Sequence, residues 1–137
     1  MKTLPETPRY AIGVDVQADH AEAIASVTAL LKERGFGILT TIDVQATLKV
    51  KLGLDVEPQT ILGACNPKLA ASALAEEGAM GVLLPCNVFV RQVAPGVNRV
   101  FLTRASALFD LVDNPAIAPV AATVDDVMQE IADILAA

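Results

Sequence analysis

The sequence offers little to metal or histidine chemistry, because it contains one histidine, His20, and two cysteines, Cys65 and Cys86. A closed zinc site takes four Cys or His ligands, and the spacing of the two cysteines matches no zinc pattern, so we expect no metal. His20 falls in the first turn of an expected helix, far along the chain from both cysteines, and we expect it to be exposed. The glycine-rich phosphate loop and the dinucleotide loop are both absent, so we expect no cofactor.

Positive charge is also scarce, since 10 Lys and Arg stand against 16 Asp and Glu, for a formal net charge of -6. Nucleic acids and anionic membranes bind clusters of basic side chains, and here only Lys49 and Lys51 lie close together. We therefore expect neither as a partner. No apolar run approaches the roughly 18 residues of a membrane span, and residues 1–8 lack the apolar core of a signal peptide. We expect a cytoplasmic protein whose cysteines are free thiols.

Aliphatic side chains dominate what is present: 53% of the 137 residues are hydrophobic, only 4% are aromatic, and tryptophan is absent. Ala, Val, Leu and Ile must therefore build the core. The length suits a single domain over residues 1–137 that buries its own core without metals or disulfides. The high aliphatic content also leaves apolar surface that an oligomer interface could cover.

Strand and helix patterns follow one another along the chain. Alternating or compact apolar runs predict strands over 10–16, 36–44, 59–65, 80–90 and 99–103. Apolar stripes and caps predict helices over 19–34, 66–77 and 105–112, and from Thr123, as N-cap, to the chain end. Residues 45–52 fit a strand or a helix, and we favour the helix because Gly53 would end it. Pro85 predicts a bulge or an edge position in its strand. This order predicts an α+β fold of two layers, with a mixed sheet of about five strands and helices mainly on one face.

Two Cys-Asn pairs concentrate the chemistry. Cys65 ends a strand, and Asn66 with the following proline opens a helix, so the thiol lies beside unpaired amides that favour a thiolate or a bound anion. Cys86 and Asn87 stand in the next strand, which we expect to run parallel to the first, so that both pairs line one pocket. The plainer interpretation is two packed cysteines, with Asn66 as a cap and Asn87 satisfying a bulge.

These motifs resemble the domain of unknown function 302 family, from about residue 36 to 103 and more loosely over the whole chain. The segments that carry the resemblance are 35–36, 42–44, 47–49, 51–53, 61–67 and 84–88. The resemblance implies a compact α+β fold, a homodimer and no established biochemical activity. It also adds Asp43 and Lys51 as possible charges at the rim of the site. The plainer interpretations are that Asp43 caps a strand end and that Lys51 is solvated. Val50 stands where the family usually has a charged residue.

Three functions remain open. The leading one is binding of a small molecule or anion, at a site formed by Cys65, Asn66, Cys86 and Asn87, with Asp43 and Lys51 at its rim. The second is a thiol-dependent enzyme or sulfur-handling protein that uses Cys65. The third is a structural or interaction module whose cysteines are only packed. The sequence does not decide whether the protein is an enzyme.

Overall fold

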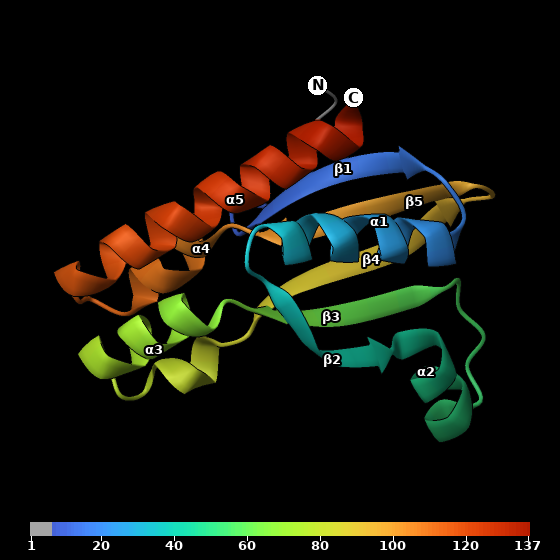
Figure 1. Ribbon diagram of the computed structural model, residues 1–137. Helices are drawn as coiled ribbons and strands as arrows, with labels where there is room; N and C mark the ends of the chain where they lie inside the picture. Colours follow the sequence, from blue (N-terminus) through green and yellow to red (C-terminus); the bar gives the residue numbers. More distant parts are fainter. Residues whose placement is uncertain (1–6) are drawn as a thin grey trace.

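One five-stranded antiparallel sheet organises the computed structural model, which describes residues 7–137. The strands are β1 (Ala11–Gln17), β2 (Gly37–Asp43), β3 (Gln59–Cys65), β4 (Cys86–Ala94) and β5 (Val97–Thr103). Their order across the sheet is β1-β5-β4-β3-β2, and each neighbouring pair is antiparallel. Strands β1 and β2 are therefore the two edges (Figure 1).

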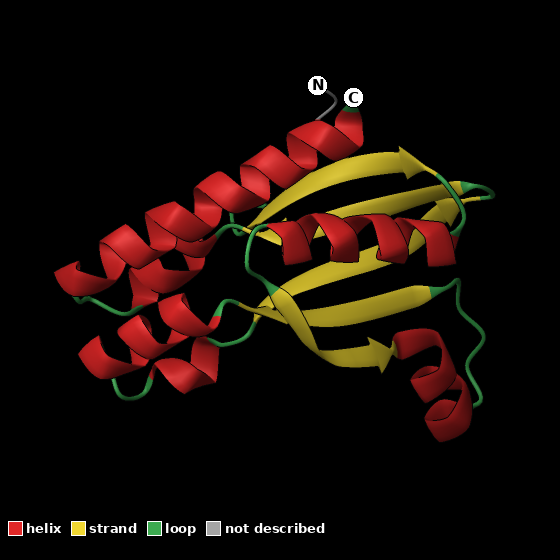
Figure 2. Ribbon diagram, in the orientation of Figure 1, coloured by secondary structure: helices red, strands yellow, loops and turns green. Residues whose placement is uncertain are grey.

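The helices gather on one face and around one end of this sheet. They are α1 (His20–Glu33), α2 (Val44–Leu52), α3 (Pro67–Glu76), α4 (Ala105–Leu108) and α5 (Ala118–Ala136). Short 3-10 turns span Met80–Leu83, Phe109–Leu111 and Pro115–Ile117. Helices α1 and α5 lie across the sheet, α3 and α4 lie beyond its end, and α2 stands apart beside β2 (Figure 2). The predicted two-layer α+β fold, with helices mainly on one face, is confirmed.

The core lies between the sheet and the pair α1 and α5. Apolar residues at helical spacing face it, and the buried ones include Val27 and Leu31 in α1 and Met128 and Ile131 in α5. Alternate strand residues face it from the sheet, among them Val88, Val100 and Leu102. Burying each such side chain contributes about 1.5–3 kcal/mol, so the alternation decides which face of the sheet carries the helices.

Local end signals act as the sequence predicts. The Asp19 carboxylate accepts from the backbone amide of Glu22 at 2.8 Å and begins α1. Asn66 caps α3, with proline in the first turn. Gly53, at φ 65°, ends α2, which confirms the helical interpretation of this ambiguous segment.

Three predictions about the fold were wrong. Strands β3 and β4 are antiparallel rather than parallel, so the sheet is not mixed: α3 lies beyond the strand ends, and the chain re-enters the sheet at the end it left. Met80–Leu83 is a 3-10 turn, so β4 begins only at Cys86. Helix α5 begins at Ala118 rather than after Thr123, because Pro119 is accepted in a first turn.

Candidate functional site

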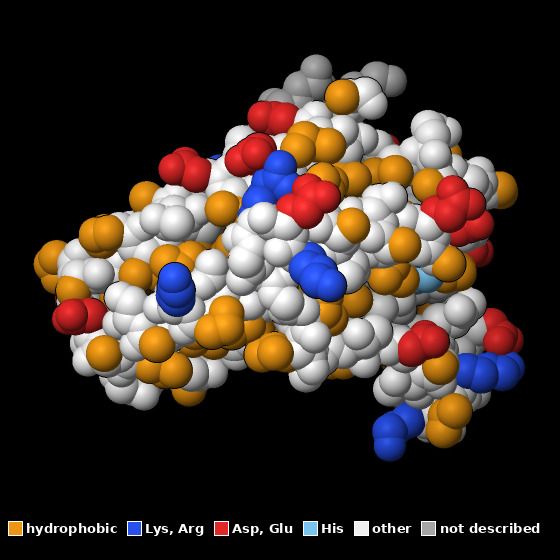
Figure 3. All heavy atoms as spheres, viewed as in Figure 1, with side chains coloured by type: hydrophobic (Ala, Val, Ile, Leu, Met, Phe, Trp, Pro, Cys, Tyr) orange, Lys and Arg blue, Asp and Glu red, His pale blue; other side chains and the backbone are white. Residues whose placement is uncertain are grey.

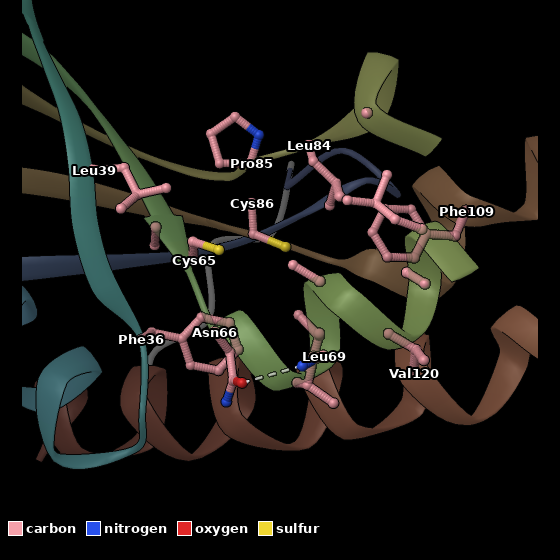
Figure 4. A pocket seen from close by; sticks show the side chains of 16 residues that line it. Phe36, Leu39, Cys65, Asn66, Leu69, Leu84, Pro85, Cys86, Phe109 and Val120 are labelled. Atoms are coloured by element: carbon pink, nitrogen blue, oxygen red, sulfur yellow. Dashed lines mark hydrogen bonds between the residues drawn. The ribbon is translucent and has the colours of Figure 1, made fainter. Parts of the chain in front are cut away.

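A cavity of about 250 Å³ opens where β3 ends and β4 begins. Its apolar walls come from β2 and the residue before it, from α3, from the turn before β4, from the Phe109–Leu111 turn and from α5. They include Phe36, Leu39, Leu69, Leu84, Phe109 and Val120 (Figure 4). Leu39 is 68% exposed and marks the mouth between β2 and α3. Three further lining residues carry sulfur or an amide: Cys65, Asn66 and Cys86. None of the described residues that line the cavity is charged.

The antiparallel ladder is what brings the two cysteines together. Cys86, the first residue of β4, pairs with Ala64, the neighbour of Cys65 at the end of β3. Cys86 is buried, Cys65 is half-buried, and both are free thiols. Both sulfur atoms project into the cavity (Figure 4). Both cysteines therefore line one cavity, although the parallel strands on which that expectation was based do not exist.

Burial sets the chemistry of Cys86. It raises the pKa of the thiol to about 11, and the nearby Cys65 and Asp125 push in the same direction. Near neutral pH the Cys86 side chain is thus a protonated thiol. Since the thiolate is the reactive form of cysteine, Cys86 is a poor nucleophile and a good apolar wall.

Asn66 caps the start of α3, where unpaired backbone amides could otherwise hold an anion. Its Oδ1 accepts from the backbone amides of Lys68 at 3.1 Å and of Leu69 at 3.2 Å. Its Nδ2 lies where a Cβ on Gly35 would approach to 3.1 Å, and Gly35 has a φ of +84°. The amides that could hold an anion are therefore partly satisfied by the chain itself.

A glycine that sequence reasoning missed shapes the region. A Cβ on Gly63 would collide with Oγ1 of Thr40 and would lie 2.9 Å from Cγ of Pro85. Pro85 follows a cis peptide bond and lines the cavity. Gly63 thus allows Pro85 and the β2 side chain to close over β3. An isolated glycine inside an apolar strand pattern is the signal that indicates such a close approach.

The remaining candidate residues do not line this cavity. Asn87 is exposed, and its backbone oxygen accepts from Oγ1 of Thr103 at 2.6 Å. Asp43 caps α2 by accepting from the amide of Ala46 at 2.9 Å. Lys51 is exposed on α2, where Lys49 rather than Lys51 is paired with Asp55. The structure therefore brings together Cys65, Asn66 and Cys86, and leaves Asp43, Lys51 and Asn87 apart.

His20 is half-buried, so the expectation of an exposed side chain was wrong. Its Nδ1 lies 2.8 Å from Oδ1 of Asn98, and its Nε2 lies 2.8 Å from Oγ1 of Thr60. Asn98 also donates to the backbone oxygen of Ala18 at 2.9 Å. Thr60 and Asn98 are polar residues at core-facing strand positions. Polar residues at such positions need buried partners, and this is the signal that sequence reasoning overlooked. The cluster ties the start of α1 to the sheet, at the end opposite the cavity.

The corner made by β2 and α2 is solvated yet rich in apolar side chains. No residue of α2 is buried. The large exposed hydrophobic residues here are Leu39 at 68%, Ile42 at 47%, Val50 at 83%, Leu52 at 72% and Leu54 at 48%. Hydrophobic side chains stand among lysines at this corner (Figure 3). We call this surface the β2–α2 face.

Within residues 7–137 no helix is long and apolar enough to cross a membrane. The same residues contain no group of three or more His, Cys, Asp or Glu side chains placed to hold a metal ion.

Comparisons with known proteins agree with this architecture. The model of the family described as a domain of unknown function, DUF302, matches residues 12–136. The crystal structure of an uncharacterized conserved DUF302 protein from Bacillus stearothermophilus matches with a TM-score of 0.84 and 30% sequence identity, over 95% of this chain and 100% of that one. No curated protein matches the chain. Together with the motifs around the two cysteines, these matches show that the chain belongs to the DUF302 family.

Proposed function

We propose that the protein binds a small, uncharged, apolar molecule in the cavity between the ends of β3 and β4 and helix α3. The observation that carries this proposal is a cavity of about 250 Å³ without a charged side chain among its described lining residues. A dry cavity of about 150 Å³ takes up benzene, so the space here suits an aromatic ring with a short substituent. Asn66 and the two thiols are the groups that can orient such a ligand.

The same features argue against an anion. Burying an unpaired charge among apolar side chains is costly, and Asn66 already accepts hydrogen bonds from two α3 amides. Of the two ligand classes that the sequence left open, an uncharged small molecule is therefore favoured over an anion. A cytoplasmic, reducing setting is part of the proposal, since both cysteines are free thiols.

Paired probes test the ligand class. Toluene and indole serve as neutral probes and benzoate as the charged one, each titrated while backbone amide NMR signals are recorded. We expect the neutral probes to shift the signals of Cys65, Leu69 and Cys86, and benzoate to leave them in place.

Ala70 and Ala71 give matched variants for this test, since Ala70 lines the cavity and its neighbour in α3 does not. Ala70→Leu should weaken toluene binding at least tenfold by filling the cavity, while Ala71→Leu should leave it unchanged. Equal binding by both variants, or no shifts with either neutral probe, would contradict the proposal.

A second function, assembly into a homodimer, is favoured by the β2–α2 face. We propose that two copies meet through it. Strand β2 is an edge strand, whose unpaired backbone groups are a template for pairing with a second β2. The flanking Val50 and Leu52 are apolar and exposed, and their burial would add hydrophobic stabilisation.

Sedimentation or light scattering at micromolar concentration tests the dimer. Leu52→Glu should yield monomers, because it places a charge in the interface. Leu111→Glu is the matched control, since Leu111 is 77% exposed in a 3-10 turn away from β2 and α2. A monomeric natural protein would overturn the proposal.

A further inference from the structure

We infer that Cys65 and Cys86 form a reversible dithiol–disulfide pair, so that the cavity wall is a site of thiol oxidation. The inference does not depend on ligand binding. It concerns the covalent state of two side chains that the fold places side by side, and the oxidant it requires is a low-molecular-weight disulfide.

The position of the two cysteines in the ladder makes the bond geometrically feasible. Cys86 pairs with Ala64, so Cys65 is its diagonal neighbour across two adjacent strands. Residues in such a ladder lie about 5 Å apart across the pair and about 3.4 Å apart along the strand, which puts the two Cα atoms about 6 Å apart. A disulfide spans Cα atoms roughly 4.4–6.8 Å apart.

The side chains also point the right way. Regular alternation would turn neighbouring residues to opposite faces of the sheet, but Cys65 is the last residue of β3, where the chain turns into α3. Both cysteines line the cavity, and both sulfur atoms enter it (Figure 4).

The difference in exposure sets the order of the steps. Cys65 is half-buried and Cys86 buried, so the external disulfide meets Cys65 first. The Cys65 thiolate attacks one sulfur of oxidised glutathione, forms a mixed disulfide and releases one glutathione thiolate. The Cys86 thiol then loses its proton to solvent and attacks the Cys65 sulfur, which releases the second glutathione thiolate. Both cysteines are oxidised, and one oxidised glutathione becomes two reduced molecules.

The second step should be slow and strongly dependent on pH. Burial, the largest cause of the pKa of about 11 that Cys86 has in the reduced protein, still acts once Cys65 carries glutathione, so only a small fraction of Cys86 is a thiolate at pH 7. Two further groups add to the effect of burial: Asp125 on α5 and, until it is bound to glutathione, Cys65 on β3. Formation of the protein disulfide should therefore accelerate about tenfold for each pH unit until the pH reaches the pKa of Cys86.

Redox titration of the full chain tests the inference. The protein is equilibrated with reduced and oxidised glutathione at pH 8 and quenched with acid and maleimide. Its intact mass is then measured by mass spectrometry. We expect a species that has lost two hydrogen atoms, takes up no maleimide and runs as a single chain on a non-reducing gel. Cys86→Ser should stop at one glutathione adduct, and Cys65→Ser should react much more slowly.

A comparison with the unfolded chain separates placement by the fold from chance encounter. The equilibrium constant for disulfide formation should be at least tenfold larger in the folded protein than in concentrated urea. Equal constants would overturn the inference. So would a folded protein, checked by circular dichroism, that accumulates only glutathione adducts or linked chains.

Discussion

The two ends of the sheet are built on the same plan and filled differently. Each end places polar side chains beside the start of a helix, α1 at one end and α3 at the other. At the α1 end, His20, Thr60 and Asn98 satisfy one another and close the space. At the α3 end, Asn66 caps the helix while two free thiols face a cavity of about 250 Å³.

The difference separates a structural cluster from a candidate site. A buried polar network whose members are all paired makes the structure specific and leaves no group for a ligand. A cavity lined by apolar side chains with a few polar groups is the usual form of a small-molecule site. If this contrast is right, changes at the α1 end should cost mainly stability, and changes at the α3 end should alter chemistry as well.

The largest effect is expected from Asn98→Ala at the α1 end. The change removes a fully buried amide and leaves both His20 Nδ1 and the Ala18 oxygen without this partner. We expect a loss of about 4 kcal/mol in the free energy of unfolding, measured in urea. Asn87→Ala is the control: it is exposed on the neighbouring strand and should cost less than about 0.5 kcal/mol. A loss for Asn98→Ala no larger than the control's would mean that the cluster does not hold this end together.

The next largest effect is expected from Gly63→Ala at the cavity end. The added Cβ meets Thr40 and Pro85, so strand β2 or the residues before β4 must shift, at a cost of about 2 kcal/mol. Gly37→Ala in the adjacent strand is matched to it, because a Cβ there meets nothing within 4 Å. Thermal unfolding should separate the two variants clearly. Toluene binding should weaken in Gly63→Ala alone, and unchanged binding would show that Pro85 does not shape the cavity.

Titration of Cys86 should lower stability in alkaline solution. Burial raises its pKa from 9.0 to about 11, so the folded protein favours the thiol more strongly than the unfolded chain does. That contribution is fully present below pH 9 and is lost as pH rises towards 11, which amounts to about 1 kcal/mol by pH 10. The free energy of unfolding should therefore fall more steeply between pH 8 and 10 in the natural protein than in Cys86→Ala. Parallel slopes would mean that the thiol is not buried in solution.

Features that depend on residues nearby in the sequence could be predicted, and features that depend on long-range contacts could not. The caps at Asp19 and Asn66 and the stop at Gly53 depend on residues a few positions away, and all three were predicted correctly. His20 finds partners 40 and 78 residues away, which no local pattern specifies. The direction of β4 depends on whether α3 crosses the sheet or lies beyond its end. Tertiary packing decides between these two positions of α3. The sequence therefore predicted that the cysteines lie near each other but not the direction of the strands that carry them.

The smallest effect is expected from Asn66→Ala, and it sharpens the comparison of the two helix starts. Losing the cap should cost roughly 0.5–1 kcal/mol, because two α3 amides lose their acceptor. Those amides then become free to bind an anion, so sulfate should restore more stability to Asn66→Ala than to the natural protein. Asp19→Ala exposes the α1 start in the same way and shows how much of any gain is common to helix ends. The gains are measured by thermal unfolding at matched ionic strength. Equal gains in the natural protein and Asn66→Ala would show that Asn66 does not keep anions from α3, and would leave the apolar walls as the one feature that disfavours a charged ligand.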